Sequence, residues 1–194
     1  MPAHPMTCAA LVLAAGRSQR FGRDKRLARL PSGQTLLAAT LSRAFEQFAV
    51  VHIVLRPDDD AQQLGIDPRA RIVWADQAEH GMGASLAAGV TALLQTPAQA
   101  VAVLLADMPW IAPRTLHTLC EQASATRIVL PLYQGQRGHP VLFGRAFWPA
   151  LAQLHGDQGG RQVILDNPRA CASVAVDDAG VVLDVDVPQA LTSM

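Results

Sequence analysis

Net charge and long apolar runs are both missing from this sequence. Lysine and arginine together number 16, as do aspartate and glutamate, so the formal net charge at pH 7 is zero. A protein without net charge has no overall attraction to nucleic acid or to an anionic membrane. The most apolar run, residues 100–106, is far too short to cross a bilayer. We therefore expect neither nucleic acid nor a membrane as a partner, and any anion-binding site must be local.

Cysteine is scarce, and the start of the sequence has no export signal. The three cysteines, Cys8, Cys120 and Cys171, are widely separated and form no C-x-x-C motif. An odd, scattered set argues against a disulfide framework and favours a reducing compartment. Residues 1–5 lack the charged and apolar segments of a signal peptide. The sequence thus predicts a cytoplasmic protein whose cysteines are small core residues.

The residues that are present favour an α/β protein. Half of the 194 residues are hydrophobic, which is enough for one domain with a substantial core, residues 1–194. Apolar runs typical of strands alternate with apolar stripes at helical spacing, and this alternation predicts a three-layer α/β fold with a mostly parallel central sheet. The predicted strands are residues 9–14, 52–55, 71–74, 100–106 and 128–130, and the helical stripes begin at Leu37, Leu86, Leu116 and Phe147.

A basic stretch with two glycines follows the first predicted strand. It matches neither the P-loop nor the dinucleotide fingerprint, because Arg23 follows Gly22 and residue 18 is serine. The small residues 14–16 still let backbone N–H groups approach an anion closely. Arg20 and Lys25 can then reach phosphate oxygens. The stretch therefore predicts a phosphate-binding loop, and the alternative is a polar loop with incidental charge.

Glycines precede the helix whose apolar stripe starts at Leu86. Gly81 and Gly83 lie where this helix is expected to begin, and a helix N-terminus offers unpaired N–H groups to an anion or to a polar ligand edge. The alternative is a tight loop in which Ser85 or Gly83 caps the helix.

Acidic residues follow two of the predicted strands. Asp107 ends the most apolar one, at the edge where ligands gather in open α/β sheets. It lies too far upstream of Pro113, the predicted helix start, to cap that helix. A carboxylate there is costly unless it is paired or metal-bound. The triplet of residues 58–60 is predicted to be a solvated turn or helix start, with metal binding as the alternative.

The motifs, in order along most of the chain, resemble those of nucleotidyltransferases that attach a nucleotide to molybdopterin. The loop L-A-[AG]-G-x-x-x-R-x-G-x-x-K matches residues 13–25, with Phe21 where the family usually has Met. Three motifs fit without a change: G-M-[SG]-x-S-[LI] at 81–86, [GA]-D-M-P at 106–109 and G-x-R-G-[HN]-P-V-L-F at 135–143. Two carry one change each: G-D-x-G-A-R at 156–161 has Gly160 for Ala, and D-[IV]-[DN]-T-P at 184–188 has Val187 for Thr.

The resemblance implies a Rossmann-like nucleotidyltransferase and a role for each matched residue. The implied catalytic residues are Arg20, Lys25 and Asp107, and the implied Mg²⁺ ligands are Asp107 and Asp186, with Asp184 as the alternative to Asp186. The implied nucleotide-binding residues are Leu13, Ala14, Ala15, Gly16, Gly81, Met82, Gly83 and Ser85. The implied acceptor-binding residues are Arg137, Gly138, His139, Asp157 and Arg161. From the residues alone, His139 is more typical of a hydrogen-bonding loop histidine than of a proton shuttle, and Arg161 also fits a surface salt bridge.

The choice of nucleotide depends on Ala15. The resembling enzymes that use CTP usually have L-A-A-G, as here, and those that use GTP usually have L-A-G-G. A methyl group at this position crowds a purine more than a pyrimidine, whereas glycine leaves the backbone uncovered. The resemblance therefore implies cytidylyl transfer from CTP to a molybdopterin-type acceptor, for delivery to a molybdoenzyme or its maturation factor.

Three alternatives remain from the sequence. A molybdopterin guanylyltransferase would share every motif apart from the residue at position 15. A sugar-phosphate nucleotidyltransferase would share the first loop, but the motifs at 135–143 and 156–161 fit it poorly. A noncatalytic cofactor-binding or chaperone module would keep the fold and could lose the carboxylates, yet Asp107 and Asp186 are both present.

Overall fold

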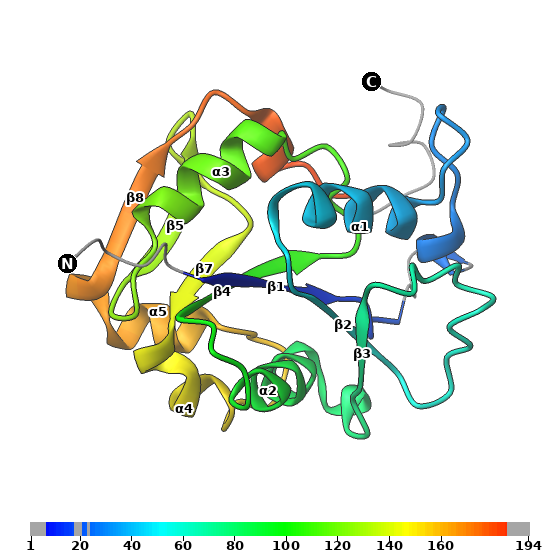
Figure 1. Cartoon of the computed structure of the whole chain (residues 1–194), viewed down its shortest axis with the longest axis horizontal. Helices are drawn as coiled ribbons and strands as arrows, with labels where there is room; N and C mark the ends of the chain where they lie inside the picture. Colours follow the sequence, from blue (N-terminus) through cyan, green and yellow to red (C-terminus); the bar gives the residue numbers. More distant parts are fainter. Residues whose placement is uncertain (1–6, 18–20, 23, 186–194) are drawn as a thin grey trace.

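The computed structural model describes residues 7–17, 21–22 and 24–185, and its centre is an eight-stranded sheet (Figure 1). The strand order is β3-β2-β1-β4-β7-β5-β6, and β8 pairs with β5. The strands are β1 (Cys8–Leu13), β2 (Val51–Leu55), β3 (Arg71–Trp74), β4 (Ala100–Leu105), β5 (Ile128–Tyr133), β6 (Gln136–Arg137), β7 (Val141–Gly144) and β8 (Cys171–Ala175).

Most of this sheet is parallel, as the sequence predicts. Strand β1 pairs in parallel with both β2 and β4, and β2 pairs in parallel with β3. Strand β7 is antiparallel to both β4 and β5, so β5 again runs in the direction of β4. After β5, the chain passes through β6 and returns to the sheet as β7, between β4 and β5.

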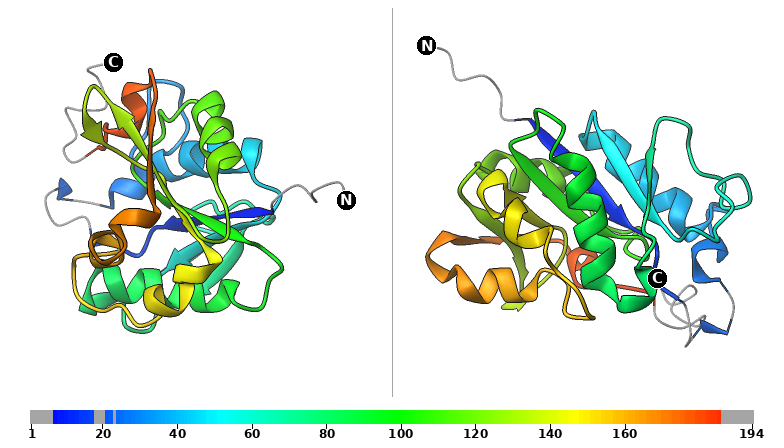
Figure 2. Two further views of the ribbon diagram at one scale, coloured as in Figure 1. Left: turned by 90° about the vertical axis from the view of Figure 1, so that its left-hand side faces the viewer. Right: turned by 90° about the horizontal axis from the view of Figure 1, so that it is seen from below.

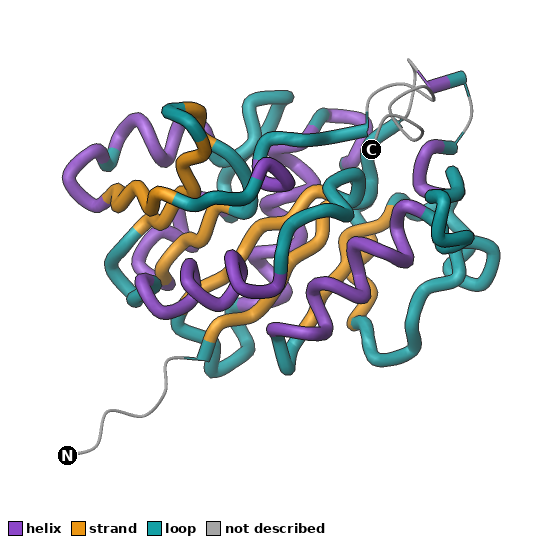
Figure 3. Tube along the Cα trace, turned by 90° about the horizontal axis from the view of Figure 1, so that it is seen from above, coloured by secondary structure: helices purple, strands orange, loops and turns teal. Residues whose placement is uncertain are grey.

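Helices cover both faces of the sheet, which gives the predicted three layers (Figures 1 and 2). One face carries α1 (Leu36–Gln47) and α3 (Pro113–Gln122), which Figure 3 shows lying over the strands. The other face carries α2 (Met82–Leu93), α4 (Trp148–Leu151) and α5 (Arg161–Asp166). The short 3-10 turns are η2 (Lys25–Leu27), η3 (Ala78–His80), η4 (Arg145–Phe147), η5 (Pro168–Ala170) and η6 (Ala179–Val181).

The alternation of side chains along β1 divides the core in two. Leu11 belongs to the cluster that includes α2, whereas Val12 belongs to the cluster that includes α1 and α3. Successive residues of a strand point to opposite faces, so one apolar strand feeds both layers. Helix α2 approaches especially closely at Gly89, where an added Cβ would lie 2.6 Å from a methyl carbon of Leu11.

The register of the central strands sets the position of the site. Leu13 and Leu105, the last residues of β1 and β4, are directly paired. Because both strands end at the same edge, the chain that follows β1 and the turn that contains Asp107 leave the sheet side by side. The terminal segment reaches the same edge, where the N–H of Val185 donates to the carbonyl of Asp107 at 3.1 Å.

One local interpretation of the sequence differs from the structure near the end of the described residues. The alternating pattern that starts at Val181 suggests a strand face carrying Asp184, but η6 ends at Val181 and residues 183–185 have no regular secondary structure. The chain here is held by separate hydrogen bonds to different loops and not by a strand ladder. Within the described ranges, no helix is long and apolar enough to cross a membrane.

Candidate functional site

An ion pair joins the loop after β1 to the turn after β4. Lys25 lies in η2, and its Nζ is 2.5 Å from Oδ2 of Asp107. The same Nζ donates to the carbonyl of Val185 at 3.4 Å. The Lys25 and Asp107 side chains are 23% and 14% exposed, so both are partly open to ligand. These two predicted catalytic residues are therefore adjacent in space although 82 positions apart in sequence.

The second carboxylate oxygen of Asp107 is the clearest candidate for holding a metal ion. Among the described residues, Oδ1 of Asp107 is buried and has no hydrogen-bond partner. A buried anionic oxygen without a partner is costly, and a hard divalent cation is the ligand that suits it. The described part of the chain contains no group of three or more His, Cys, Asp or Glu side chains that could hold a metal. Within these described ranges, a metal held by Asp107 would take its other ligands from phosphate and water oxygens, and Mg²⁺ commonly combines such oxygens with one or two carboxylates.

Arg20 and Asp186 lie outside the described residues. Asp184 is described, and its charge acts on the imidazole of His139. Of the two predicted metal ligands, Asp107 and Asp186, only Asp107 lies among the described residues.

A cavity of about 690 Å³ extends from this ion pair across the ends of β1 and α2. It brings together seven of the eight predicted nucleotide-binding residues, namely Leu13, Ala14, Ala15, Gly16, Gly81, Met82 and Ser85, with Lys25, Asp107 and Asp157. Asp157, which the resemblance assigns to the acceptor, thus lies on this side of the site. We call this space the nucleotide cavity.

Gly83 is the predicted nucleotide-binding residue that does not line the nucleotide cavity. Its N–H donates to the carbonyl of Gly156 at 2.7 Å, and an added Cβ would lie 2.7 Å from the carbonyl oxygen of His155. Glycine at this position therefore lets residues 155–156 pack directly on the first turn of α2. The N-cap of α2 is Gly81, with φ of 101°, and not Ser85 or Gly83 as the alternative interpretation of the loop proposed. A positive φ of this kind favours glycine.

A second cavity of about 440 Å³ adjoins the first and shares Leu13, Met82 and Leu105 with it. Four of the five predicted acceptor-binding residues line it: Arg137, Gly138, His139 and Arg161. Its other walls are largely apolar and include Leu130, Val141 and Phe143. We call this space the acceptor cavity. Two arginines beside apolar walls suit a flat organic molecule that carries a phosphate.

His139 lines the acceptor cavity and also contacts the chain at Val181. Its backbone N–H donates to the carbonyl of Val181 at 2.7 Å. Its Nδ1 is buried without a hydrogen-bond partner among the described residues. Burial lowers the pKa of His139, and the nearby charges of Asp107 and Asp184 only partly oppose this. The imidazole is therefore neutral at neutral pH, so that it can orient a ligand by hydrogen bonding without adding a positive charge.

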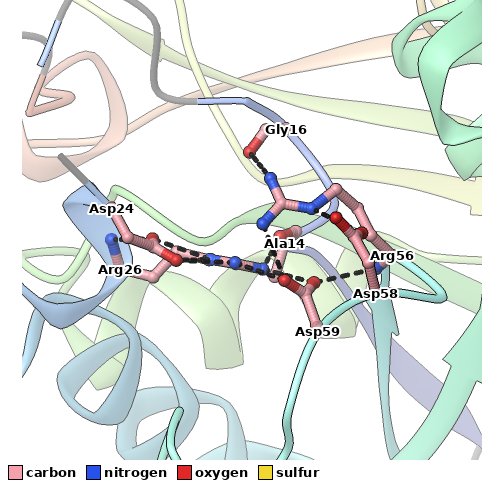
Figure 4. Close-up of polar contacts among 7 residues, drawn as sticks. All are labelled: Ala14, Gly16, Asp24, Arg26, Arg56, Asp58 and Asp59. Atoms are coloured by element: carbon pink, nitrogen blue, oxygen red, sulfur yellow. Dashed lines mark hydrogen bonds and ion pairs between the residues drawn. The ribbon is translucent and has the colours of Figure 1, made fainter. Parts of the chain in front are cut away.

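The most extensive polar network at the site was not predicted from the sequence (Figure 4). Its centre is Arg26, whose side chain is only 4% exposed. The guanidinium bonds to the carboxylates of Asp24 and Asp59 and to the carbonyl of Ala14. Arg56 also bonds to Asp59, with Nη2 2.7 Å from Oδ1. Nothing in the sequence distinguishes Arg26 from the other arginines, because its partners come together only in the fold.

This network corrects the prediction of a solvated acidic turn at Asp59 only, because Asp58 and Asp60 are exposed as predicted. The side chain of Asp59 is only 3% exposed and is occupied by two arginines, which rules out free solvation. Burial alone would raise the pKa values of Asp24 and Asp59, but the hydrogen bonds and charge of Arg26 outweigh burial and lower both. The pKa of Arg26 is raised because its bonds to these two carboxylates outweigh its own desolvation. The cluster is therefore fully ionised at neutral pH.

The sequence matches a known family along almost its whole length. Residues 10–188 match the model of the MobA-like NTP transferase domain. The purine catabolism protein PucB of Bacillus subtilis (strain 168) is 26% identical over 187 residues, or 91% of this chain and 90% of PucB. A probable molybdenum cofactor guanylyltransferase of Chloroflexus aggregans (strain MD-66 / DSM 9485) is 36% identical over 123 residues. That match covers 62% of this chain and 55% of the relative.

The fold matches solved structures equally well. The crystal structure of Rv0371c from Mycobacterium tuberculosis H37Rv has 31% sequence identity and a TM-score of 0.84, with 97% of each chain covered. A complex of Rv0371c with manganese has 28% identity and a TM-score of 0.79, and the match covers 97% of this chain and 100% of that one. This chain therefore belongs to the MobA-like NTP transferase domain family and is a nucleotidyltransferase of that type.

Proposed function

We propose that this nucleotidyltransferase moves a cytidylyl group from CTP to a phosphorylated, molybdopterin-type acceptor and releases pyrophosphate. The observation that carries the proposal is the position of the Lys25–Asp107 pair, at the end of a nucleotide cavity that adjoins an arginine-bearing acceptor cavity. Two substrates that must react with each other need two adjoining binding spaces, and charged groups between them can orient the reacting phosphates.

The proposed reaction is a displacement at the α-phosphorus of CTP. A phosphate oxygen of the acceptor forms the new bond, and the bond from the α-phosphorus to the bridging oxygen of pyrophosphate breaks. The protein has little covalent chemistry to perform, so alignment and charge stabilisation provide most of the rate enhancement. Arg137 and Arg161 would hold the acceptor phosphate, and Lys25 would stabilise the charge on the departing pyrophosphate. Arg20 is proposed for the same task from the sequence motif alone.

Asp107 is the residue proposed to hold Mg²⁺, through the buried Oδ1 that lacks a partner. When bound, the ion would supply positive charge to the phosphate oxygens. A relative of 28% identity has been crystallised as a complex with manganese, which supports a divalent ion in this family. Asp186 remains the proposed second ligand.

CTP is the proposed donor because Ala15 lines the nucleotide cavity. Guanylyl transfer is the second candidate, and it is favoured by the similarity to the probable molybdenum cofactor guanylyltransferase of Chloroflexus aggregans, which is 36% identical over 123 residues. The molybdopterin-type acceptor is proposed on the sequence motifs and on the same relative. The molybdoenzyme or maturation factor that would receive the product stays a proposal from the resemblance.

The direct test is to incubate the protein with each nucleoside triphosphate, Mg²⁺ and molybdopterin, and to identify products by mass. We expect cytidylylated molybdopterin and one pyrophosphate for each product. A parallel reaction with a sugar phosphate should give no product. Product with GTP and none with CTP would identify GTP as the donor. Product with the sugar phosphate alone would identify a sugar phosphate, and not molybdopterin, as the acceptor.

A further inference from the structure

Arg26 connects the two ends of the nucleotide loop, defined here as residues 14–25. At one end, its Nη1 donates to the carbonyl of Ala14 at 2.8 Å. At the other end, its Nη2 donates to Asp24 at 2.7 Å, and Asp24 in turn accepts from the backbone N–H of Arg26 at 3.0 Å. A single side chain therefore holds the start and the finish of the loop together (Figure 4).

The guanidinium of Arg26 has no donor left for a ligand. Its Nε bonds to Asp24, its Nη1 bonds to Ala14 and Asp59, and its Nη2 bonds to Asp24 and Asp59. An arginine has five N–H groups, and these bonds use all of them. Arg26 borders the nucleotide cavity, but any effect on a nucleotide must pass through the residues that it holds.

The bond to Ala14 determines the direction of the next N–H group. The C=O and N–H of a trans peptide point in opposite directions. Arg26, Asp59 and Arg56 lie on the β2 side of β1, and the N–H of Ala14 also points there, donating to Val54. With the carbonyl of Ala14 held on that side, the N–H of Ala15 must point toward β4 and the nucleotide cavity. Within the described ranges, that N–H has no hydrogen-bond acceptor.

A second arginine supports the same arrangement. Nη1 of Arg56 lies 3.5 Å from the carbonyl of Gly16, and Asp59 holds both arginines. The carbonyls of Ala14 and Gly16 are thus each contacted by an arginine, and both arginines bond to the buried carboxylate of Asp59.

We propose that Arg26 is a positioning residue for the nucleotide: it fixes the peptide between Ala14 and Ala15 so that the Ala15 N–H is preoriented toward the bound nucleoside triphosphate. The inference rests on the proposed function, because it needs a nucleotide in the nucleotide cavity. A peptide group held in its binding orientation in advance loses less conformational freedom on binding, which strengthens affinity without a new contact.

The test compares Arg26→Lys with Arg69→Lys as a matched control. Arg69 also bonds to a neighbouring aspartate through Nε and Nη2, but its side chain is 67% exposed and it lies on neither cavity. Lysine keeps the charge and cannot reproduce the planar fork. We expect the dissociation constant of CTP to rise about tenfold in Arg26→Lys, with the KM of the acceptor unchanged. Arg69→Lys should bind CTP as the parent protein does.

Two further variants keep the test decisive if Arg26→Lys folds poorly. Asp59 holds Arg26 but does not itself line the nucleotide cavity. Asp59→Asn removes the charge that holds Arg26, so this variant should also weaken CTP binding. Arg26→Gly should recover CTP affinity when guanidinium is added at millimolar concentration, and not when sodium chloride is added at the same concentration.

The outcomes separate this inference from the proposed function. A parent protein that binds no nucleoside triphosphate would overturn both. A parent that binds CTP, with folded Arg26→Lys and Asp59→Asn of parental affinity, would overturn the inference alone. Recovery of thermal stability by guanidinium without recovery of CTP affinity would likewise make Arg26 a purely structural residue.

Discussion

The ammonium nitrogen of Lys25 and the Oδ2 atom of Asp107 lie 2.5 Å apart, where the ends of β1 and β4 meet. In the proposed reaction these two groups serve different ligands, since the ammonium suits phosphate oxygens and the carboxylate suits a cation. Their contact stabilises both charges when neither ligand is bound. A bound nucleotide would give the Lys25 ammonium phosphate oxygens as further partners, and Asp107 would hold the cation through its other oxygen, Oδ1.

Lys25→Ala should lower kcat about 10²-fold, because one preorganised donor to the departing charge is lost. The free energy of unfolding should fall by no more than about 1 kcal/mol, because both members of the pair are partly open to solvent. Steady-state rates and urea unfolding measure the two effects. Arg43→Ala, which removes an exposed partner of Glu46, is the control. A Lys25→Ala enzyme with parental kcat would remove Lys25 from the catalytic set.

Asp107→Asn should keep the fold and lose metal-dependent turnover. The amide keeps the size of the side chain but binds a divalent cation far more weakly than a carboxylate does. Titration with Mn²⁺, followed by electron paramagnetic resonance, measures the affinity directly, and Asp67→Asn at an exposed turn provides the comparison. Equal Mn²⁺ affinity in the Asp107→Asn variant and the parent would place the metal elsewhere.

Ala15→Gly should shift the donor preference toward GTP. Removing one methyl from a pocket changes discrimination by about 10–200-fold at most. The ratio of kcat/KM for CTP to kcat/KM for GTP should therefore decrease in Ala15→Gly by a factor in this range. Both triphosphates are assayed with the same acceptor. If Ala15→Gly, alone and combined with changes at its neighbours in the loop, shows no shift, the methyl group does not select the base.

The carboxylates around Arg26 should make stability depend on acidic pH. The pKa values of Asp24 and Asp59 are lowered in the folded protein, so the unfolded chain binds protons at a higher pH than the folded one does. Their contribution is complete above the ordinary aspartate pKa, about 3.9, and is lost as the pH falls through the lower folded values. Unfolding free energies measured between neutral pH and pH 3 should show this loss.

Asp59→Asn provides the comparison for that pH series. The variant has no carboxyl at position 59 to protonate, so its stability should be lower at neutral pH and fall less steeply on acidification. Parallel curves for the parent and Asp59→Asn would show that the Asp59 carboxyl does not carry the pH dependence.

The layers of the fold could be predicted because they depend on local pattern. Strand β4 is a continuous apolar run and α1 has an apolar stripe, and each pattern specifies its element without knowledge of its partners. Membership of the nucleotidyltransferase family was predicted from the ordered motifs and is confirmed. The individual catalytic roles of Lys25 and Asp107 stay predictions, although the structure places the two side chains together.

The environment of Asp59 could not be predicted, because it depends on residues distant in sequence. The triplet of residues 58–60 looks like a solvated turn, yet Arg26 reaches Asp59 from 33 positions away. The alternation after Val181 was equally misleading. Val181 and Val185 are buried, but their backbone groups bond to His139 and Asp107 instead of a neighbouring strand. A short alternating pattern indicates burial more reliably than it indicates a ladder.

Val185 accepts a hydrogen bond from Lys25 and donates one to the backbone of Asp107. Both of those residues are synthesised long before Val185, as are all eight strands of the sheet. A nascent chain that has reached β8 already contains the complete scaffold, but it lacks the backbone group that links the two charged residues. Synthesis thus makes the sheet available first, and the backbone groups of Val185 that bond to Lys25 and Asp107 become available only afterwards.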